Sequence, residues 1–316
     1  MKKVFLQQNT CYLCGSDHHR LLFSCRSGLE AHLCQECGLI FAARRFDPDA
    51  LGQYLKNGYS EKAGDLTQAW EQTFRVERAR RRVDFLRTGV KTKPPIRLLE
   101  IGSYIGHFLW LAQEEGWQVT GLEPDPEVAV FAREKAGAPV EVGLVADYVK
   151  DNKRQFDLVC MFHVLEHIPQ PVRVLRALHG QVGVNNYLCL EVPNADSCGE
   201  GDWPQFFEAD ETHQWFFGQR TLGLMLGQAG FHIEKAAVVP AHAGPRGALL
   251  VLARAVDHSD PVDPAASRNP TLVRKLYQRL LLKRLNWRFG TGPWWRLYRR
   301  LRLVAWHVVK GRRRTC

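Results

Sequence analysis

Short apolar runs alternate with amphipathic stretches between residue 96 and about residue 255. A strand followed by a helix, repeated several times, is the pattern of βαβ units, which build a parallel sheet covered by helices on both faces. The pattern therefore predicts an α/β fold with a Rossmann-like, doubly wound sheet. The seven predicted strands are 96–101, 118–122, 140–142, 156–162, 187–192, 233–239 and 248–253.

The same pattern divides the chain into five parts. Helical spacing is expected over 65–87, after a connection over 47–64, and Pro94-Pro95 ends any helix because proline cannot continue the hydrogen-bond ladder. Three prolines and small polar residues favour a linker at 257–270. The predicted parts are a Cys-rich module at 1–46, a helical connector at 47–93, a Rossmann-like domain at 94–256, the linker, and a basic helical tail at 271–316.

A glycine-containing turn joins the first predicted strand to an apolar helix. The sequence at 98–109 reads Leu-Leu-Glu-Ile-Gly-Ser-Tyr-Ile-Gly-His-Phe-Leu. Glycines in such a turn let the backbone bend sharply and approach a ligand closely. Gly102 and Gly106 depart from the Gly-x-Gly-x-x-Gly spacing of dinucleotide enzymes, which argues against NAD.

Glu123 stands about 20 residues after this turn, at the end of the next predicted strand. From that position a carboxylate accepts hydrogen bonds from both hydroxyls of a ribose. A glycine turn alone is a weak signal, and Glu123 alone is equally well explained as a solvated loop acid. Because the two lie in register with successive strands, together they predict a nucleotide-type cofactor.

Several motifs follow one another over 96–255. They are Glu-Ile-Gly-Ser-Tyr-Ile-Gly at 100–106, Gly-Leu-Glu-Pro at 121–124, Phe-Asp-Leu-Val at 156–159, His-Val-Leu-Glu-His-Ile-Pro at 163–169, Glu-Val-Pro-Asn at 191–194, His-Gln-Trp-Phe-Phe at 213–217, Thr-Leu at 221–222 and Ala-Gly-Phe at 229–231. Their order resembles that of class I S-adenosylmethionine-dependent methyltransferases of the ubiquinone-biosynthesis-like group, found in many bacterial biosynthetic clusters.

This resemblance implies that S-adenosylmethionine binds at the glycine turn. The turn would hold the methionine part, Glu123 the ribose, and Asp147 the exocyclic amine of adenine. Tyr104 stands where family members usually have glycine, and its side chain would narrow the pocket. The implied cofactor residues are Glu100, Gly102, Ser103, Gly106, Glu123, Asp147 and Phe162.

Three histidines are candidate catalytic bases. His163 and His167 follow the fourth predicted strand of the domain, at the edge where open α/β sheets bind ligands, and His213 lies beside three aromatic residues. An imidazole with a pKa near neutrality can take a proton from an attacking hydroxyl. A packing or helix-orienting role is at least as good an explanation for each of them, and the sequence does not choose among the three.

Cys11, Cys14, Cys34 and Cys37 form two Cys-x-x-Cys pairs separated by nineteen residues. Four thiolates at this spacing can close a tetrahedral shell around Zn²⁺, which leaves no open position for catalysis. The spacing predicts a structural zinc ribbon, and packing is expected for Cys25 between the pairs. A ribbon ahead of this kind of transferase resembles bacterial enzymes that methylate sugars or other cluster products, in which the ribbon shapes the acceptor side.

The formal net charge of +10 comes from the C-terminal part of the chain. All acidic residues precede Pro264, and 15 Lys and Arg follow it. Basic residues alternate with Leu, Trp and Tyr at helical spacing over 271–316, which suits an anionic membrane surface, a lid packed on the body, or RNA phosphates. The membrane surface and the lid are favoured over RNA.

No apolar run is long enough to span a membrane, and the N-terminus turns polar too soon for a signal peptide, so we expect a cytoplasmic protein, with a peripheral place at the inner membrane face if the tail binds lipid. The leading functional hypothesis is O-methylation, less favourably C-methylation, of a sugar, glycan or lipid-linked intermediate. The alternatives are an RNA methyltransferase and a non-catalytic zinc-containing adaptor, the latter motivated by Tyr104. The oligomeric state is not predicted.

Overall fold

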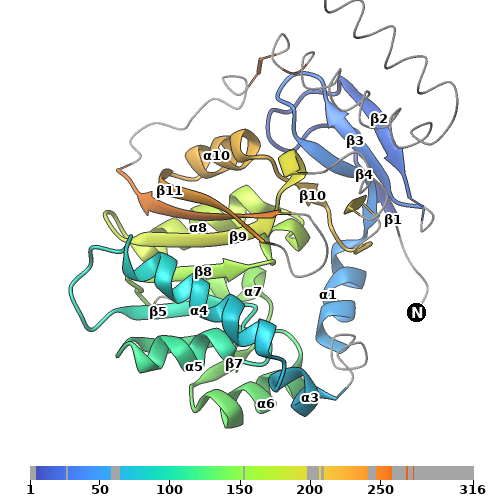
Figure 1. Cartoon of the computed structure of the whole chain (residues 1–316). Coiled ribbons are helices and arrows are strands. Elements are labelled where there is room, and N and C mark those ends of the chain that lie inside the picture. The colour runs from blue at the N-terminus through green and yellow to red at the C-terminus, as the bar shows by residue number, and fades with distance from the viewer. Residues whose placement is uncertain are drawn as a thin grey trace, which may run out of the picture.

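The computed structural model describes residues 5–25, 28–57, 65–151, 154–197, 206–207, 210–240, 247–257, 268–269 and 273. Two sheets organise these residues (Figure 1). A seven-stranded sheet forms the body of the molecule, and a smaller sheet forms an N-terminal module at its side.

All seven predicted strands are present in the larger sheet, in the order β11-β12-β9-β8-β5-β6-β7. The sheet is mixed, whereas the sequence predicts a parallel one. β12 pairs antiparallel with both β9 and β11. Six residues separate β11 from β12, which is too few for a crossover helix, so these two strands run antiparallel. The strands are β5 (Arg97–Ile101), β6 (Gln118–Glu123), β7 (Val140–Val142), β8 (Leu158–Phe162), β9 (Tyr187–Pro193), β11 (Phe231–Pro240) and β12 (Gly247–Ala255).

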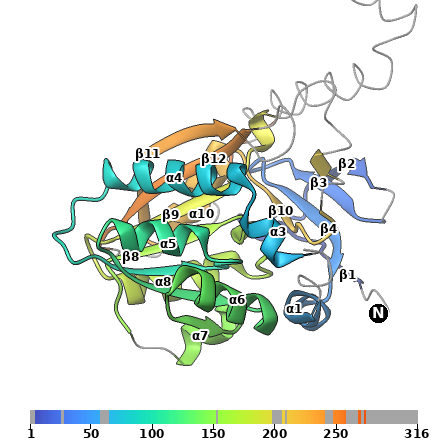
Figure 2. The ribbon, with the colours of Figure 1, turned by 60° about the horizontal axis from the view of Figure 1, so that its bottom comes forward.

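Helices cover both faces of this sheet, as the doubly wound fold requires (Figure 2). Alternate residues of each strand contribute to the two apolar cores: Leu99 and Ile101 face one core, and Leu98 faces the other. One face carries α4 (Thr73–Arg87), α5 (His107–Glu114) and α6 (Pro126–Ala136); the other carries α7 (Val145–Asp151), α8 (Pro171–Val182) and α10 (Gln219–Gln228).

The helix predicted over 65–87 is broken into α3 (Leu66–Trp70) and α4. Asp65 caps α3 by accepting hydrogen bonds from the backbone N–H groups of Thr67 (2.8 Å) and Gln68 (3.3 Å). His107 Nε2 lies 2.9 Å from the Trp70 carbonyl oxygen, and its ring stacks on the Trp70 ring with centroids 4.2 Å apart. This tertiary contact satisfies a carbonyl that a continuous helix would have used, so the chain turns there.

The N-terminal module is a sheet of β1 (Phe5–Gln7), β4 (Ile40–Phe46), β3 (Glu30–Cys34) and β2 (His19–Ser24). A fifth strand, β10 (Trp215–Phe216), comes from the predicted Rossmann-like part of the chain and pairs antiparallel with β4. The module and the body therefore share a sheet. The side chain of Cys25 is buried in the core of the module, in agreement with the expected packing role.

A helix that the sequence analysis missed, α1 (Pro48–Asn57), lies in the segment expected to be a connection. Asp47 Oδ1 accepts hydrogen bonds from the N–H groups of Asp49 (3.0 Å) and Ala50 (3.2 Å), and Pro48 occupies the first helical position. Asp followed by Pro is a helix-start signal, so this element was predictable from the sequence.

Most of the predicted basic tail, 271–272 and 274–316, lies outside the described residues. Val273 is buried against the N-terminal module in a cluster that includes Leu22 and Phe207, and the Arg268 guanidinium donates to the Cys14 carbonyl (3.2 Å). Within the part of the chain that the structure describes, no helix has the length and apolar character needed to cross a membrane.

Candidate functional site

A cavity of about 690 Å³ opens at the carboxyl ends of β5, β6 and β8, the edge at which open α/β sheets bind ligands. Every predicted cofactor residue lines it, together with two of the three candidate bases. The predicted residues in its wall are Glu100, Gly102, Ser103, Gly106, Glu123, Asp147, Phe162, His163 and His167.

The glycine turn between β5 and α5 needs its glycines. Gly102 and Gly106 have φ angles of 72° and 90°, in the left-handed region that side chains disfavour. A Cβ atom at Gly102 would lie 2.5 Å from Val164 Cγ2, and one at Gly106 would lie 3.0 Å from the Ala136 Cβ. Tyr104 also adopts a left-handed conformation, with φ of 47°, a strain on the order of 1 kcal/mol for a residue with a side chain.

Glu123 is held in place by the backbone of this turn and of its own loop. Its Oε2 accepts a hydrogen bond from the Tyr104 N–H (2.8 Å), and its Oε1 accepts one from the Asp125 N–H (3.2 Å). Burial raises the pKa of Glu123 to about 7, against these hydrogen bonds, which lower it. The carboxylate is thus positioned before any ligand arrives and still offers free lone pairs.

Two neighbouring side chains present polar atoms that pair with none of the described residues. Glu100 Oε2 and Ser103 Oγ are buried without a hydrogen-bond partner, although buried polar atoms are normally satisfied. Burial raises the pKa of Glu100, and the charge of Arg82 opposes this. These atoms, with the glycine cradle and Glu123, fit a ligand that carries an amine and ribose hydroxyls, as S-adenosylmethionine does.

Asp147 and Phe162 occupy different parts of the wall. The Asp147 side chain is 60% exposed at the start of α7 and pairs with Lys150 Nζ (3.0 Å). The Phe162 ring packs edge-to-face on Phe108 at 4.8 Å between centroids, and the Arg82 guanidinium carbon lies 4.1 Å from its centroid. Phe162 therefore forms an apolar, closely packed part of the wall, and Asp147 forms its solvent-facing rim.

Three arginines of α4 reach the cavity and were not predicted as site residues: Arg75, Arg78 and Arg82. Arg82 is buried and forms an ion pair with Glu191 at 2.6 Å. Burial lowers the pKa of Arg78 to about 10. Their spacing of three and four residues places them on one helical face, but that spacing does not show which part of the fold the face borders.

His163 is held between two buried carboxylates. Its Nε2 lies 2.9 Å from Glu191 Oε1, and its Nδ1 lies 3.3 Å from Glu166 Oε1. Burial disfavours the imidazolium, but the two glutamates outweigh it and raise the pKa of His163. Since both ring nitrogens face carboxylates, His163 is better suited to hold a proton than to accept one from an acceptor.

His167 has one committed and one uncommitted nitrogen. The Thr212 hydroxyl donates its single proton to Asp210 Oδ1 (2.5 Å) and lies 2.8 Å from His167 Nδ1. Nδ1 must therefore carry a proton and donate to Thr212, so in the neutral imidazole the lone pair lies on Nε2. Of the two histidines in the cavity wall, His167 is the one that can act as a base.

His213 lies next to His167 but does not line the cavity. The two rings are 4.8 Å apart between centroids. Burial and the neighbouring His167 lower the pKa of His213 to about 4, so its imidazole is neutral at physiological pH. The backbone N–H of Gln214 donates to the Glu166 carbonyl (2.8 Å), which ties this segment to the turn after β8.

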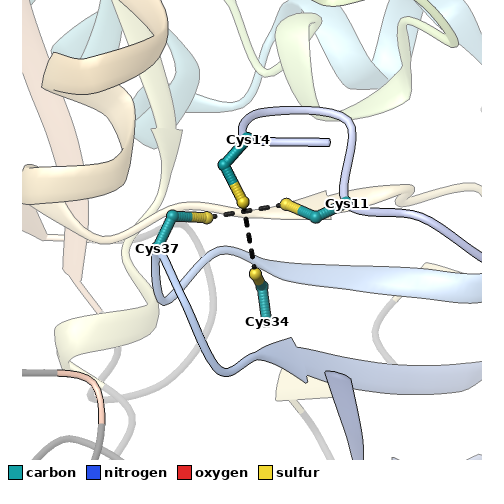
Figure 3. A group of neighbouring side chains, drawn as sticks. All are labelled: Cys11, Cys14, Cys34 and Cys37. Carbon is teal, nitrogen blue, oxygen red and sulfur yellow. Dashed lines mark hydrogen bonds between the residues drawn. The ribbon is translucent and has the colours of Figure 1, made fainter. Parts of the chain in front are cut away.

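The four predicted zinc ligands converge in the N-terminal module (Figure 3). Their ligand atoms lie within 4.8 Å of one another, with Sγ atoms 3.5 Å apart for Cys11 and Cys37 and 3.6 Å apart for Cys14 and Cys34. Zn–S bonds of about 2.3 Å in a tetrahedron place sulfurs about 3.8 Å apart, so the thiols fit zinc.

Comparisons with known proteins agree with this geometry. Structural neighbours include the 1,6-didemethyltoxoflavin-N1-methyltransferase of Burkholderia thailandensis with bound S-adenosylhomocysteine (TM-score 0.52, 18% identity, 69% of this chain and 96% of that chain covered). They also include the magnesium protoporphyrin IX methyltransferase of Synechocystis PCC 6803 with bound S-adenosylhomocysteine (TM-score 0.51, 14% identity, 66% and 99% covered).

These identities are low, and a search of the curated proteins found no match. The neighbours therefore show the fold: the seven-stranded sheet is that of the class I S-adenosylmethionine-dependent methyltransferases. The sequence itself is informative at the family level, because residues 69–236 match the family described as "Methyltransferase domain". This match covers more than half of the chain and includes the whole glycine turn, Glu123 and the histidine cluster, so the chain belongs to the methyltransferase domain family.

Proposed function

We propose that this protein transfers the methyl group of S-adenosylmethionine to a hydroxyl oxygen of a sugar, glycan or lipid-linked biosynthetic intermediate. The observation that carries the cofactor assignment is Glu123, a buried carboxylate fixed by two backbone N–H groups beside the glycine turn. Such a group is preorganised to accept hydrogen bonds from a ribose. Because the carboxylate already loses most of its water when the protein folds, ligand binding does not have to remove that water again.

S-adenosylmethionine brings its own activation, since its sulfonium group makes the methyl carbon electrophilic. The protein has to bind, align and dehydrate the reactants. Glu100 and Ser103 supply unpaired polar atoms suited to the methionine part, and the remaining lone pairs of the Glu123 carboxylate suit the ribose. Asp147, exposed at the start of α7, is the adenine-side acid of this proposal.

The acceptor belongs at the end of the cavity formed by His163, His167 and Pro169. The lone pair on His167 Nε2 favours an acceptor that must lose a proton, and a hydroxyl loses one more readily than a carbon acid does. The N-terminal module borders this end, because Arg45 Nη1 donates to the Pro169 carbonyl (3.3 Å). This contact supports a role for the module in shaping the acceptor side.

Zinc in the four-cysteine site is part of the same proposal, in a structural role. Gly15 and Gly38 follow the two Cys pairs with φ angles of 71° and 81°, and their N–H groups donate to the carbonyls of Cys11 (2.8 Å) and Cys34 (3.0 Å). Such tight turns direct two thiols from each loop toward one point. With four cysteine ligands, zinc would have no open position for the reaction.

Calorimetric titration with S-adenosylhomocysteine tests the cofactor assignment. We expect micromolar binding to the zinc-loaded full-length protein and its loss in Glu123→Ala. Glu134→Ala, which removes an exposed carboxylate from α6, is the matched control and should bind as the wild type does. Absence of binding to the wild type would overturn the methyltransferase proposal and favour the adaptor hypothesis.

Transfer of a labelled methyl group then tests the acceptor class. Wild-type protein should label a hydroxyl-rich glycan or lipid-linked fraction, and His167→Ala should label it much less while it still binds S-adenosylhomocysteine. Labelling of RNA in place of that fraction would replace the proposed acceptor with the RNA alternative.

A further inference from the structure

A second group of potential metal ligands lies behind the cavity wall, apart from the four cysteines. Glu166, His167 and His213 each offer one ligand atom, and these atoms lie within 4.8 Å of one another. Glu166 Oε1 and His213 Nε2 are 4.0 Å apart. Three protein donors bound to one cation at about 2.1 Å lie roughly 3–3.5 Å apart, so small side-chain adjustments would close the site.

The carboxylate of Glu166 gives independent evidence for a bound cation at this place. Its side chain is fully buried, and neither carboxylate oxygen has a hydrogen-bond partner among the described residues. His163 Nδ1, at 3.3 Å, supplies a nearby charge to Oε1 alone. A buried carboxylate normally satisfies both oxygens, since the loss of water around an ionised group is costly when nothing replaces it.

The surroundings of His167 orient it as a ligand. The chain from Asp210 through the Thr212 hydroxyl holds the proton on Nδ1 and leaves the lone pair on Nε2. Metal-bound histidines almost always donate their other N–H to an oxygen in this way, which fixes the tautomer and the ring orientation. His213 adds a second imidazole whose ring lies against that of His167.

We propose that Glu166, His167 and His213 bind a divalent cation at the edge of the cavity. Two imidazoles and one carboxylate suit Mn²⁺, Fe²⁺ or Zn²⁺ and leave coordination positions open. His167 lines the cavity, whereas Glu166 and His213 do not, so the open positions would face the acceptor end through His167. An acceptor oxygen bound at an open position would lose its proton more readily, and the cation would then replace His167 in promoting that loss, because it occupies the lone pair on Nε2. This role toward the acceptor rests on the proposed function, whereas the binding of the cation does not.

Titration with Mn²⁺ followed by electron paramagnetic resonance tests this site in the full-length, zinc-loaded protein. Mn²⁺ is the suitable probe because cysteine thiolates select zinc, whereas imidazole and carboxylate accept Mn²⁺. We expect one Mn²⁺ bound per chain, and at least about tenfold weaker binding in Glu166→Gln, which keeps the shape but removes the charge. His232→Gln, which removes an exposed histidine of β11, controls for surface binding and should leave the affinity unchanged.

Mn²⁺ should also raise the melting temperature of the wild type and leave that of Glu166→Gln nearly unchanged, because a ligand stabilises only the fold that binds it. If Glu166→Gln does not fold, His213→Ala removes a ligand from a less buried position and gives the same comparison. Wild-type protein that does not bind Mn²⁺, or equal binding by a folded ligand variant, would overturn the metal site. Binding of S-adenosylhomocysteine in that same preparation would show that the methyltransferase proposal stands independently.

Discussion

The two ends of the cavity are built in different ways. The cofactor end uses a single stretch of chain from Glu100 to Gly106 and one carboxylate at the end of the adjacent strand, Glu123. The histidine end combines the turn after β8 with residues 210–213 and rests on the N-terminal module through β10. At the cofactor end, the backbone of one short segment positions the polar groups. The histidine end forms only where segments far apart in the sequence meet.

Zinc removal should separate the two ends most strongly. Structural zinc contributes on the order of 10 kcal/mol to the folding of a small module. In Cys34→Ser we expect the N-terminal sheet to lose its order, with β10 and His213 displaced, so methyl transfer should be lost while S-adenosylhomocysteine still binds. Radiolabel transfer and calorimetry on the same sample measure the two effects. Equal loss of methyl transfer and of S-adenosylhomocysteine binding would show that the two ends of the cavity are not independent.

Arg82 joins the ends, since it pairs with Glu191, which in turn contacts His163. Removing one partner of a buried ion pair costs about 3–5 kcal/mol because the other charge stays buried. Arg82→Met should therefore lower the free energy of unfolding by about that amount, as measured by urea denaturation.

The control is Arg87→Met on the same helix. The Arg87 side chain is 61% exposed and contacts Asp84 and Glu115 at 3.6 and 3.8 Å. An exposed pair contributes about 0–1 kcal/mol, so this variant should be nearly as stable as the wild type. Similar decreases in the free energy of unfolding in both variants would show that the buried Arg82–Glu191 pair contributes no more to stability than an exposed pair does.

A methyl group in the glycine turn should damage the cofactor end alone. In Gly102→Ala the new Cβ would lie 2.5 Å from Val164 Cγ2 at a φ of +72°, and such overpacking with strain costs about 1–3 kcal/mol. We expect that loss in thermal unfolding, with weaker S-adenosylhomocysteine binding. Gly180→Ala, in α8 with open space around its Cβ, should be neutral or slightly stabilising. Unimpaired folding and binding in Gly102→Ala would contradict the steric argument.

The smallest expected effect is a pH dependence of cofactor binding. Burial raises the pKa of Glu123 to about 7, so the fraction of carboxylate falls as the pH drops through that value. If the ribose binds the ionised form, S-adenosylhomocysteine should bind about tenfold more weakly at about pH 6 than at about pH 8. Calorimetry at both values measures this change. Glu123→Gln should bind weakly at both, and an unchanged pH slope in that variant would assign the dependence to another group.

Prediction from sequence was most successful where the signal is local. All seven strands of the larger sheet were predicted, because each is a short apolar run between helical segments. The order of the sheet, its two antiparallel pairs and the break at Trp70 were not, since they depend on contacts with residues far along the chain. The arginines of α4 belong to the same class: their sequence spacing shows a helical face, but not what that face covers.

The sequence by itself determined the features that a few consecutive residues can encode: the glycine turn, Glu123 at the end of the next strand, and the two Cys-x-x-Cys pairs. Tertiary structure alone decided the roles of the three histidines. It placed His163 between Glu166 and Glu191, left the lone pair of His167 free through Thr212, and put His213 behind the cavity wall. The reason is physical: a backbone conformation follows from local sterics, whereas the protonation and partners of a side chain depend on charges and burial supplied by distant parts of the fold.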